Sequence, residues 1–223
     1  MSYILSIETS TTNCSVALSK EGDTIALKED NSHNYSHAEL LHQFIEEVLA
    51  EAEVSINRLS AIAVSKGPGS YTGLRIGVSA AKGLCFSLDI PLIAISTLES
   101  LANQVTVENG CIVAMLDARR MEAYTAVYNF RHELVREIKA EILSVNSFED
   151  ILKHQKVVFI GNAVNKFSSL IESAKATFVY HKLPSANDMS SLAFQQLKIG
   201  KTEDVAYFEP FYLKNFIALK SKR

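Results

Sequence analysis

Residues 3–27 read YILSIETSTTNCSVALSKEGDTIAL, and this stretch decides the fold class. Residues 3–7 form an apolar run that ends on the acid Glu8, which is typical of a buried strand reaching a polar edge of a sheet. A polar turn leads to a second apolar run at residues 14–18. A Glu-Gly-Asp turn at residues 21–23 then reverses the chain into a third apolar run, which indicates a hairpin. The stretch therefore predicts three consecutive strands, with an acid at the end of the first.

The same order of features recurs in residues 111–142, CIVAMLDARRMEAYTAVYNFRHELVREIKAEI. The apolar run at its start again ends on an acid, Asp117, and a short polar turn leads into a second run. An Arg-His-Glu turn at residues 131–133 leads into the third. Further along each copy, a short apolar run, at residues 61–64 and 157–160, is followed by a glycine. The chain therefore contains the same succession of strands twice.

Two such copies predict a duplicated α/β unit. The arrangement resembles the double domain of actin, hexokinase and the heat-shock chaperones, in which each half is ribonuclease-H-like. We expect residues 1–105 to form the first half and residues 106–223 the second. The resemblance implies that the two strand-ending acids, Glu8 and Asp117, face a nucleotide cleft between the halves. A fold does not by itself supply a function.

A glycine-rich loop, KGPGSYTGLRIG at residues 66–77, raises the question of phosphate binding. A Walker loop requires Lys and then Ser or Thr directly after its last glycine, whereas Leu and Arg follow Gly73 here. The dinucleotide fingerprint requires two residues between its second and third glycines, whereas three separate Gly69 from Gly73. Neither motif fits, so we interpret Gly67, Gly69 and Gly73 as serving turn geometry and close packing.

The helix expected over residues 74–88 supports this interpretation. Gly73, Gly77 and Ala81 are spaced four residues apart, so they form one ridge of small side chains on the helix. Such a ridge allows another backbone to approach the helix closely.

The composition is that of an ordinary globular protein, with 223 residues, 48% hydrophobic and 21% charged. The formal net charge of −3 supplies no basic field that could hold nucleic acid by itself, and we interpret the basic residues within 220–223 as a solvated tail. No apolar run reaches the length of a membrane span. The cysteines form no CxxC pair, so we expect a cytoplasmic location with reduced, buried thiols at Cys14, Cys85 and Cys111.

Several segments together resemble one protein family, the TsaB (YeaZ) family. They are ILSIETS and CSVAL near the start, SHAELLHQFIEEVL, SKGPGSYTGLRIGVSAAKGL and PLIAISTLESLA. LDARRMEAY and FEPFYLK in the second half are also similar to family segments. The resemblance covers essentially the first half with high specificity, and the region between the last two segments matches loosely.

This resemblance implies a non-catalytic subunit in making threonylcarbamoyladenosine on tRNA. The implied partners are a larger catalytic paralogue, TsaD, and the ATPase TsaE, with tRNA reached only through the complex. Family members also form homodimers through the first helices of the first half. The family usually has aspartate at the position of Glu8 and the nucleotide-binding relatives follow it with a glycine-containing turn, whereas here the turn is Thr-Ser-Thr. We therefore expect no cofactor, with ATP or ADP only at a composite interface.

An alternative function is a small-molecule kinase or ATPase that uses Glu8 and Asp117 as a carboxylate pair. Strand-ending acids are also often simply solvated, and we favour that interpretation. A ribonuclease-H-type nuclease needs several clustered acids, whereas the sequence has one strand-ending acid in each half.

Three histidines, His33, His37 and His42, call for a test of metal binding, because two histidines one helical turn apart can bind zinc or iron. His33 precedes the expected helix N-cap, Ser36, so it does not share a helix face with His37. No nearby carboxylate or thiol completes a ligand set, and we expect no metal site.

The helix expected from Ser36 to about residue 52 has an unusually wide apolar face. A capping box of Ser36 and Glu39 predicts its start, and its apolar positions sweep about 180° of its surface, whereas a helix resting on a core needs about 100°. We assign the surplus edge, Leu40 and Phe44, to a partner surface. The alternative is that a second element of the same chain covers this edge. Arg75 and Lys82, on a polar face of the second helix, are expected to form the rim of the interface.

Overall fold

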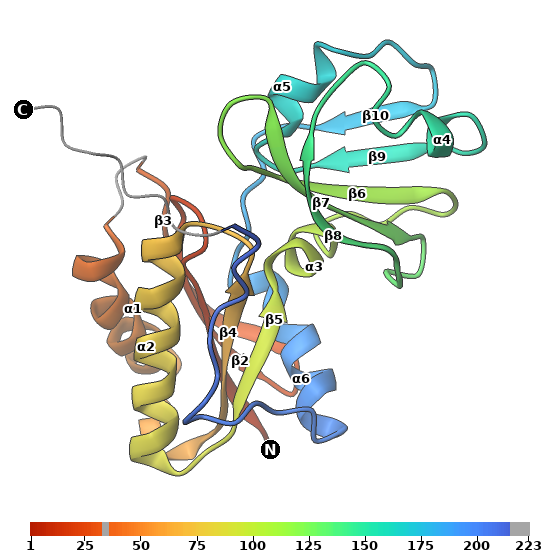
Figure 1. Cartoon of the computed structure of the whole chain (residues 1–223). Coiled ribbons are helices and arrows are strands. Elements are labelled where there is room, and N and C mark those ends of the chain that lie inside the picture. The colour runs from red at the N-terminus through yellow and green to blue at the C-terminus, as the bar shows by residue number, and fades with distance from the viewer. Residues whose placement is uncertain (33–35, 215–223) are drawn as a thin grey trace, which may run out of the picture.

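The computed structural model describes residues 1–32 and 36–214, and it shows two lobes that are each built on a five-stranded sheet (Figure 1). The first sheet has the order β3-β2-β1-β4-β5. Its strands are β1 (Tyr3–Glu8), β2 (Cys14–Lys20), β3 (Asp23–Asp30), β4 (Leu59–Gly67) and β5 (Leu92–Ser96). β2 is antiparallel to both of its neighbours, whereas β1, β4 and β5 run parallel to one another.

The second sheet repeats this plan. Its strands are β6 (Cys111–Asp117), β7 (Glu122–Asn129), β8 (Leu134–Ile142), β9 (Val157–Ile160) and β10 (Ala176–Val179). Read from the β8 edge, the order β8-β7-β6-β9-β10 is that of the first sheet. The last residue pair of the first hairpin is Glu8 with Ser15, and that of the equivalent hairpin is Asp117 with Ala123. The predicted duplicated, ribonuclease-H-like α/β unit is confirmed.

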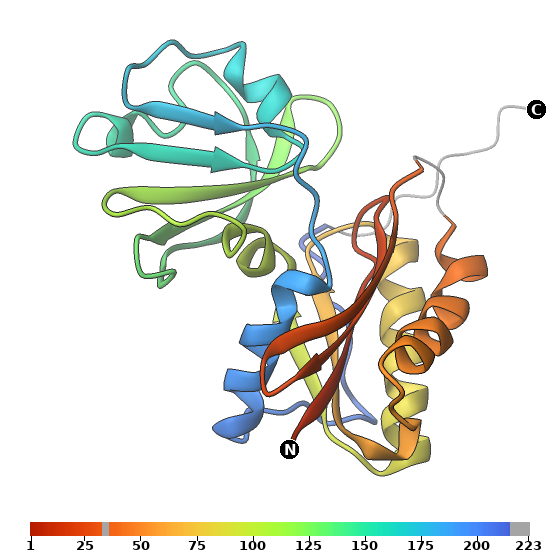
Figure 2. The ribbon, with the colours of Figure 1, turned by 180° about the vertical axis from the view of Figure 1, so that it is seen from behind.

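Helices cover both faces of the first sheet (Figures 1 and 2). α1 (His37–Glu51) and α2 (Tyr71–Leu88) lie on one face, where Leu5 and Ile7 point, and α6 (Ser190–Lys198) lies on the other, where Ile4 points. Burial on both faces explains why β1 is a continuous apolar run rather than an alternating one.

In the second half, an aromatic cluster fills the core beside the sheet. The rings of Phe148, Phe159 and Phe167 lie 5.0–5.5 Å apart between centroids. Two short helices, α4 (Glu149–Leu152) and α5 (Val164–Ser168), belong to this half. Two short 3-10 helices, Ile56–Arg58 and Asn187–Met189, are also present.

The two halves exchange helices, which corrects the expected domain boundary. α3 (Thr97–Ala102) follows β5, yet Leu98, Leu101 and Ala102 join the core of the second sheet. After β10 the chain returns to the first lobe, where Met189 and Ala193 pack against β1, β4 and β5 (Figure 2). The expectation that everything after residue 105 forms the second half is therefore wrong for residues 187–214, because the apolar face of α6 is buried on the first sheet.

The last described residues, 203–214, form what we call the C-terminal segment, and they run along the first lobe. Glu203 N–H donates to the Leu92 carbonyl at 2.8 Å, and Phe211 N–H donates to the Lys66 carbonyl at 2.7 Å. These two bonds hold the segment against β5 and the end of β4. The basic residues at 220–223 lie outside the described residues.

The two predicted helices of the first half begin and end close to the expected residues. The capping box predicted at the start of the first helix does not form. Ser36 precedes α1 without capping it, because its hydroxyl donates to the Asp30 carboxylate at 2.8 Å. At α2 the cap is Ser70, whose hydroxyl accepts from Gly73 N–H at 3.3 Å. No helix within the described ranges has the length and apolar character needed to cross a bilayer.

Candidate functional site

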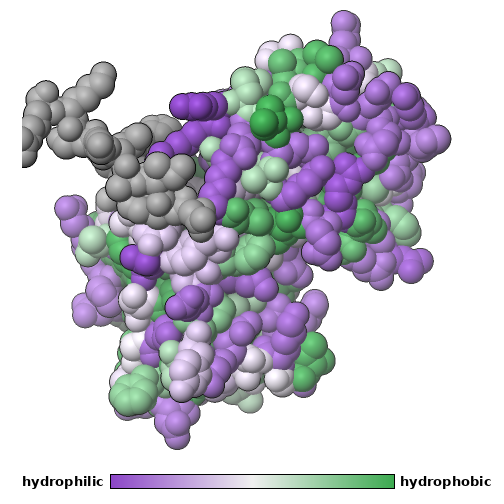
Figure 3. Space-filling model, in the orientation of Figure 1, coloured by the Kyte–Doolittle hydropathy of each residue, from purple (hydrophilic) through white to green (hydrophobic). Residues whose placement is uncertain are grey.

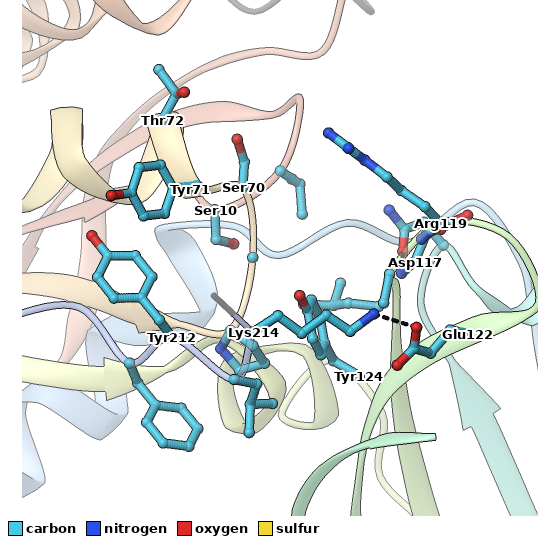
Figure 4. A pocket seen from close by; sticks show the side chains of 18 of the residues that line it. Ser10, Ser70, Tyr71, Thr72, Asp117, Arg119, Glu122, Tyr124, Tyr212 and Lys214 are labelled. Atoms are coloured by element: carbon cyan, nitrogen blue, oxygen red, sulfur yellow. Dashed lines mark hydrogen bonds and ion pairs between the residues drawn. The ribbon is translucent and has the colours of Figure 1, made fainter. Parts of the chain in front are cut away.

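A pocket of about 990 Å³ lies between the two halves. Residues from both lobes line it. They come from the β1–β2 turn, the glycine loop with the start of α2, the end of β6 with the following turn and the start of β7, Asn162 after β9, and the end of the C-terminal segment. The face of the molecule in Figure 3 is largely hydrophilic, with smaller hydrophobic areas. Figure 4 shows Tyr71 and Tyr212 on one side of the pocket and Asp117, Arg119 and Glu122 on the other.

The glycine loop is packed against the β1–β2 turn. A Cβ atom on Gly69 would lie 2.4 Å from the Ser10 carbonyl oxygen, and one on Gly73 would lie 2.1 Å from the Thr9 carbonyl oxygen. Both distances are impossible for real side chains, so the two backbones touch directly. Gly67 has φ +106°, a left-handed conformation that favours glycine. Close packing and backbone geometry therefore account for glycine at these three positions.

Glu8 does not face the pocket. Its side chain is fully buried, and one carboxyl oxygen accepts from Ser10 N–H at 2.6 Å and from the Ser65 hydroxyl at 2.9 Å. The other oxygen has no hydrogen-bond partner within the described part of the chain. Burial raises the pKa of Glu8, although the bonds from Ser10 and Ser65 partly oppose the rise. The expectation that this acid is solvated is wrong, because the β1–β2 turn folds over it.

Asp117, by contrast, lines the pocket and is exposed. Its carboxylate accepts from Arg119 N–H at 2.6 Å and forms an ion pair with Lys166 at 3.1 Å. The Asp117 N–H in turn donates to the Asn162 side chain at 2.7 Å. The fold therefore does not bring Glu8 and Asp117 together as a carboxylate pair facing the pocket.

The burial of the Glu8 carboxyl predicts how the unfolding free energy of the protein depends on pH. Because the folded state raises the pKa of Glu8, it keeps the proton at pH values where the unfolded chain has lost it. The unfolding free energy of the natural protein should therefore fall as pH rises above about 4, the usual glutamate range. Glu8→Gln removes this titration, so urea unfolding should show the variant gaining stability relative to the natural protein between pH 4 and pH 8. Glu46→Gln, on the exposed side of α1, is the control, and a constant difference for Glu8→Gln would contradict the burial argument.

The histidines form no metal site within the residues that the structure describes. His37 is buried, and its ring Nε2 lies 2.7 Å from the Thr11 carbonyl oxygen. Burial lowers the pKa of His37, which favours the neutral ring. His42 is exposed on α1, and His33 lies outside the described residues.

The three cysteines are buried and free, as expected. Burial raises the pKa of Cys14 to about 12 and that of Cys85 to about 11. These thiols are therefore poor nucleophiles.

Known proteins resemble this chain over nearly its whole length. The tRNA threonylcarbamoyladenosine biosynthesis protein TsaB of Escherichia coli K12 is 30% identical over 97% of this chain and 96% of its own length. The chain belongs to the TsaB family.

Further comparisons agree with membership of the TsaB family. The Bacillus subtilis protein of the same name is 33% identical over 91% of this chain and 89% of its own length. The family model for TsaD, tRNA N6-adenosine threonylcarbamoyltransferase, matches residues 31–221. The solved structure of YeaZ from Pseudomonas aeruginosa has a TM-score of 0.82 and 29% identity, covering 96% of this chain and all of that one.

One residue expected at the partner surface of this TsaB-family protein lies elsewhere. Phe44 is only 9% exposed and belongs to the core beneath α1, so the prediction that it occupies a spare apolar edge is wrong. Leu40 is partly buried against the same core. The apolar stripe of α1 is wide because the helix packs both on β2 and β3 and on α2.

The two expected rim cations are held by the chain itself. Lys82 Nζ donates to the Ala206 and Phe208 carbonyls at 3.1 and 3.0 Å, and Arg75 Nε donates to the Tyr212 hydroxyl at 3.3 Å. They anchor the C-terminal segment to α2. Any partner that reaches these side chains must therefore contact the segment too.

Reasoning from the sequence missed Phe86, which is 86% exposed. It follows Ser79 and Gly83 on the exposed side of α2. A large aromatic residue on the otherwise polar or small face of the expected helix could have indicated an exposed contact residue. It also missed the pocket residues Arg119, Arg120 and Tyr212, because nothing local indicates that the segments carrying them meet.

Proposed function

We propose that this protein is a non-catalytic subunit in the biosynthesis of threonylcarbamoyladenosine on tRNA. It would bind the catalytic paralogue TsaD, with TsaE as a further member of the assembly and a homodimer in the absence of these partners. The names of the E. coli and B. subtilis relatives support the pathway, and the TsaD family-model match supports kinship with the proposed partner.

The position of Glu8 carries the non-catalytic part of the proposal. A kinase or ATPase that uses the acids of both halves requires both carboxylates to face the cleft. Here Glu8 is buried under the β1–β2 turn, and Asp117 is paired with Lys166. The main alternative, a small-molecule kinase or ATPase using these two acids, is therefore disfavoured.

The outer surface of α1 and α2 is the proposed partner surface, with Phe86 as its apolar anchor. Phe86 is exposed beside small residues, so a partner helix can approach the α2 backbone closely: a Cβ on Gly83 would meet no atom within 4 Å. Large exposed aromatic side chains of this kind are common energetic anchors of interfaces. Arg75 and Lys82 lie beside this surface and link it to the C-terminal segment.

Phe86→Asp tests the proposal. The substitution would place a carboxylate against apolar partner atoms, so the Kd for TsaD of the same organism should rise at least about 30-fold, equivalent to about 2 kcal/mol. Sedimentation of the mixture measures assembly, and formation of modified adenosine with ATP, bicarbonate, threonine, the carbamoyl-AMP-forming enzyme and tRNA measures activity. Both should be lost together, and the melting temperature should not change.

Ile142→Asp is the matched control, because Ile142 is 76% exposed on β8 in the other lobe. It should assemble and support activity normally. Undiminished assembly of Phe86→Asp would place the partner surface elsewhere. Product formed by the isolated chain without TsaD would contradict the non-catalytic role.

A further inference from the structure

Two arginines on one side of the cleft form no ion pair within the part of the chain that the structure describes. Arg119 and Arg120, in the turn between β6 and β7, are exposed and line the pocket. The acids beside them are already paired: Asp117 with Lys166, and Glu122 with Lys214. Neither guanidinium group has an ion-pair partner in residues 1–32 or 36–214. This edge of the cleft therefore carries local positive charge on a protein whose net charge is −3.

An aromatic platform faces them from the other lobe. The rings of Tyr71 and Tyr212 lie 4.9 Å apart between centroids, and the Arg75 guanidinium lies 4.2 Å from the centre of the Tyr71 ring. Tyr212 is held in place by its bond from Arg75 and by the bond from Phe211 N–H to the Lys66 carbonyl. Both tyrosines line the pocket, so the platform is built before any ligand arrives.

The arginines and the tyrosines lie on opposite sides of the pocket of about 990 Å³, and the Lys214–Glu122 ion pair lies between them in Figure 4. Arginine binds phosphate oxygens with two parallel hydrogen bonds, and aromatic rings stack on nucleobases regardless of sequence. A cavity of this size accommodates a nucleotide. The combination fits a phosphate next to a base.

We propose that this cleft binds one nucleotide of a single-stranded RNA segment, with its phosphate at Arg119 and Arg120 and its base against Tyr71 and Tyr212. The inference rests on the proposed role in tRNA modification, and it replaces the expectation that tRNA is met only through the complex. RNA fits better than a free nucleoside triphosphate, whose extra charge would need the strand-ending acids to hold a metal ion in the cleft. Glu8 is buried away from it.

The test measures fluorescence anisotropy of labelled, unmodified tRNA with the isolated full chain at low ionic strength, where phosphate contacts are strongest. The double variant Arg119→Ala, Arg120→Ala should weaken binding about tenfold or more and reduce the slope of affinity against salt by about 1–2. Tyr212→Leu should weaken tRNA binding about tenfold, because stacking on the ring is lost. Tyr212→Phe keeps an aromatic ring and should bind tRNA as the natural chain does. Melting temperatures verify that each variant is folded.

Arg131→Ala is the matched control, because Arg131 is an exposed arginine at the opposite end of β7. It should change tRNA affinity by less than about twofold. Equal losses in Arg131→Ala and the double variant, unchanged binding in the double variant, or no tRNA binding by the natural chain at low salt would each overturn the inference. Calorimetry with AMP and ATP distinguishes the sources of phosphate: binding of free nucleotide that the same variants abolish, with tRNA affinity unchanged, would also overturn it.

The tRNA-binding result does not depend on assembly with TsaD, because TsaD is absent from the binding measurement. Loss of RNA binding with normal TsaD binding contradicts this inference alone. Normal RNA binding without TsaD binding contradicts the proposed partner role alone.

Discussion

Gly73→Ala should destabilise the fold by about 3 kcal/mol, although it adds only one methyl group. The new Cβ would lie 2.1 Å from the Thr9 carbonyl oxygen and 3.4 Å from the His37 ring. The obstacle is backbone, so no flexible side chain can move aside. The β1–β2 turn would have to shift, and that shift would disturb the hydrogen bond from the Thr9 hydroxyl to the Gly73 carbonyl at 2.8 Å.

Urea unfolding followed by circular dichroism measures this effect, and Gly83→Ala is its control in the same helix. A Cβ on Gly83 meets no atom within 4 Å, so alanine there should stabilise the protein by about 0.5–1 kcal/mol through helix propensity. The two substitutions are chemically identical and are expected to have opposite signs. Similar midpoints for both would show that the glycine loop is not tightly packed.

Phe44→Ala is expected to cost about 3–5 kcal/mol in unfolding free energy, the range for removing a large aromatic side chain from a core. The ring lies in the core that α1 shares with the first sheet. Its removal leaves a cavity that α1 cannot close, because the helix is held by β2, β3 and α2 together. Phe44→Asp should be worse, since it buries a carboxylate without a partner. The measurement is again the urea midpoint and its slope.

Phe86→Ala provides the comparison, because that ring is exposed and its loss should change stability by less than about 0.5 kcal/mol. The two phenylalanine-to-alanine variants therefore compare the stability effect of a core residue on α1 with that of a surface residue on α2. The contrary outcome is that Phe44→Ala unfolds at the same urea midpoint as the natural protein but fails to assemble with TsaD. Phe44 would then be a partner contact and not a core residue.

Much of the fold could be predicted from local patterns. The strands ending at Glu8 and Asp117, their hairpin turns and the helix spanning Gly73, Gly77 and Ala81 all appear close to the expected positions. Strand and helix signals depend on residues within about one turn or one strand, so the sequence contains them directly. The same holds for the ridge of small residues, since its spacing is a property of one helix.

Which neighbour covers a given side chain could not be predicted in this way. The wide stripe of α1 was assigned to a surplus apolar edge, but α1 packs on β2, β3 and α2, and Phe44 belongs to the core that they share. Arg75 and Lys82 looked like rim charges, but a segment more than a hundred residues later binds them. In each case the deciding contact is made by a distant part of the chain.

The sequence by itself determined the duplicated α/β plan, the absence of the two phosphate-loop motifs and the tight packing at the glycine loop. These follow from residue spacing along a single strand, turn or helix, where geometry is fixed by the covalent chain. Only the tertiary structure decided that Glu8 is buried while Asp117 is exposed, that α6 returns to the first sheet, and that Tyr212 meets Arg119 and Arg120 at one cleft. Burial and proximity depend on which surfaces meet after folding, and no local pattern encodes the position of a partner surface that lies far away in the chain.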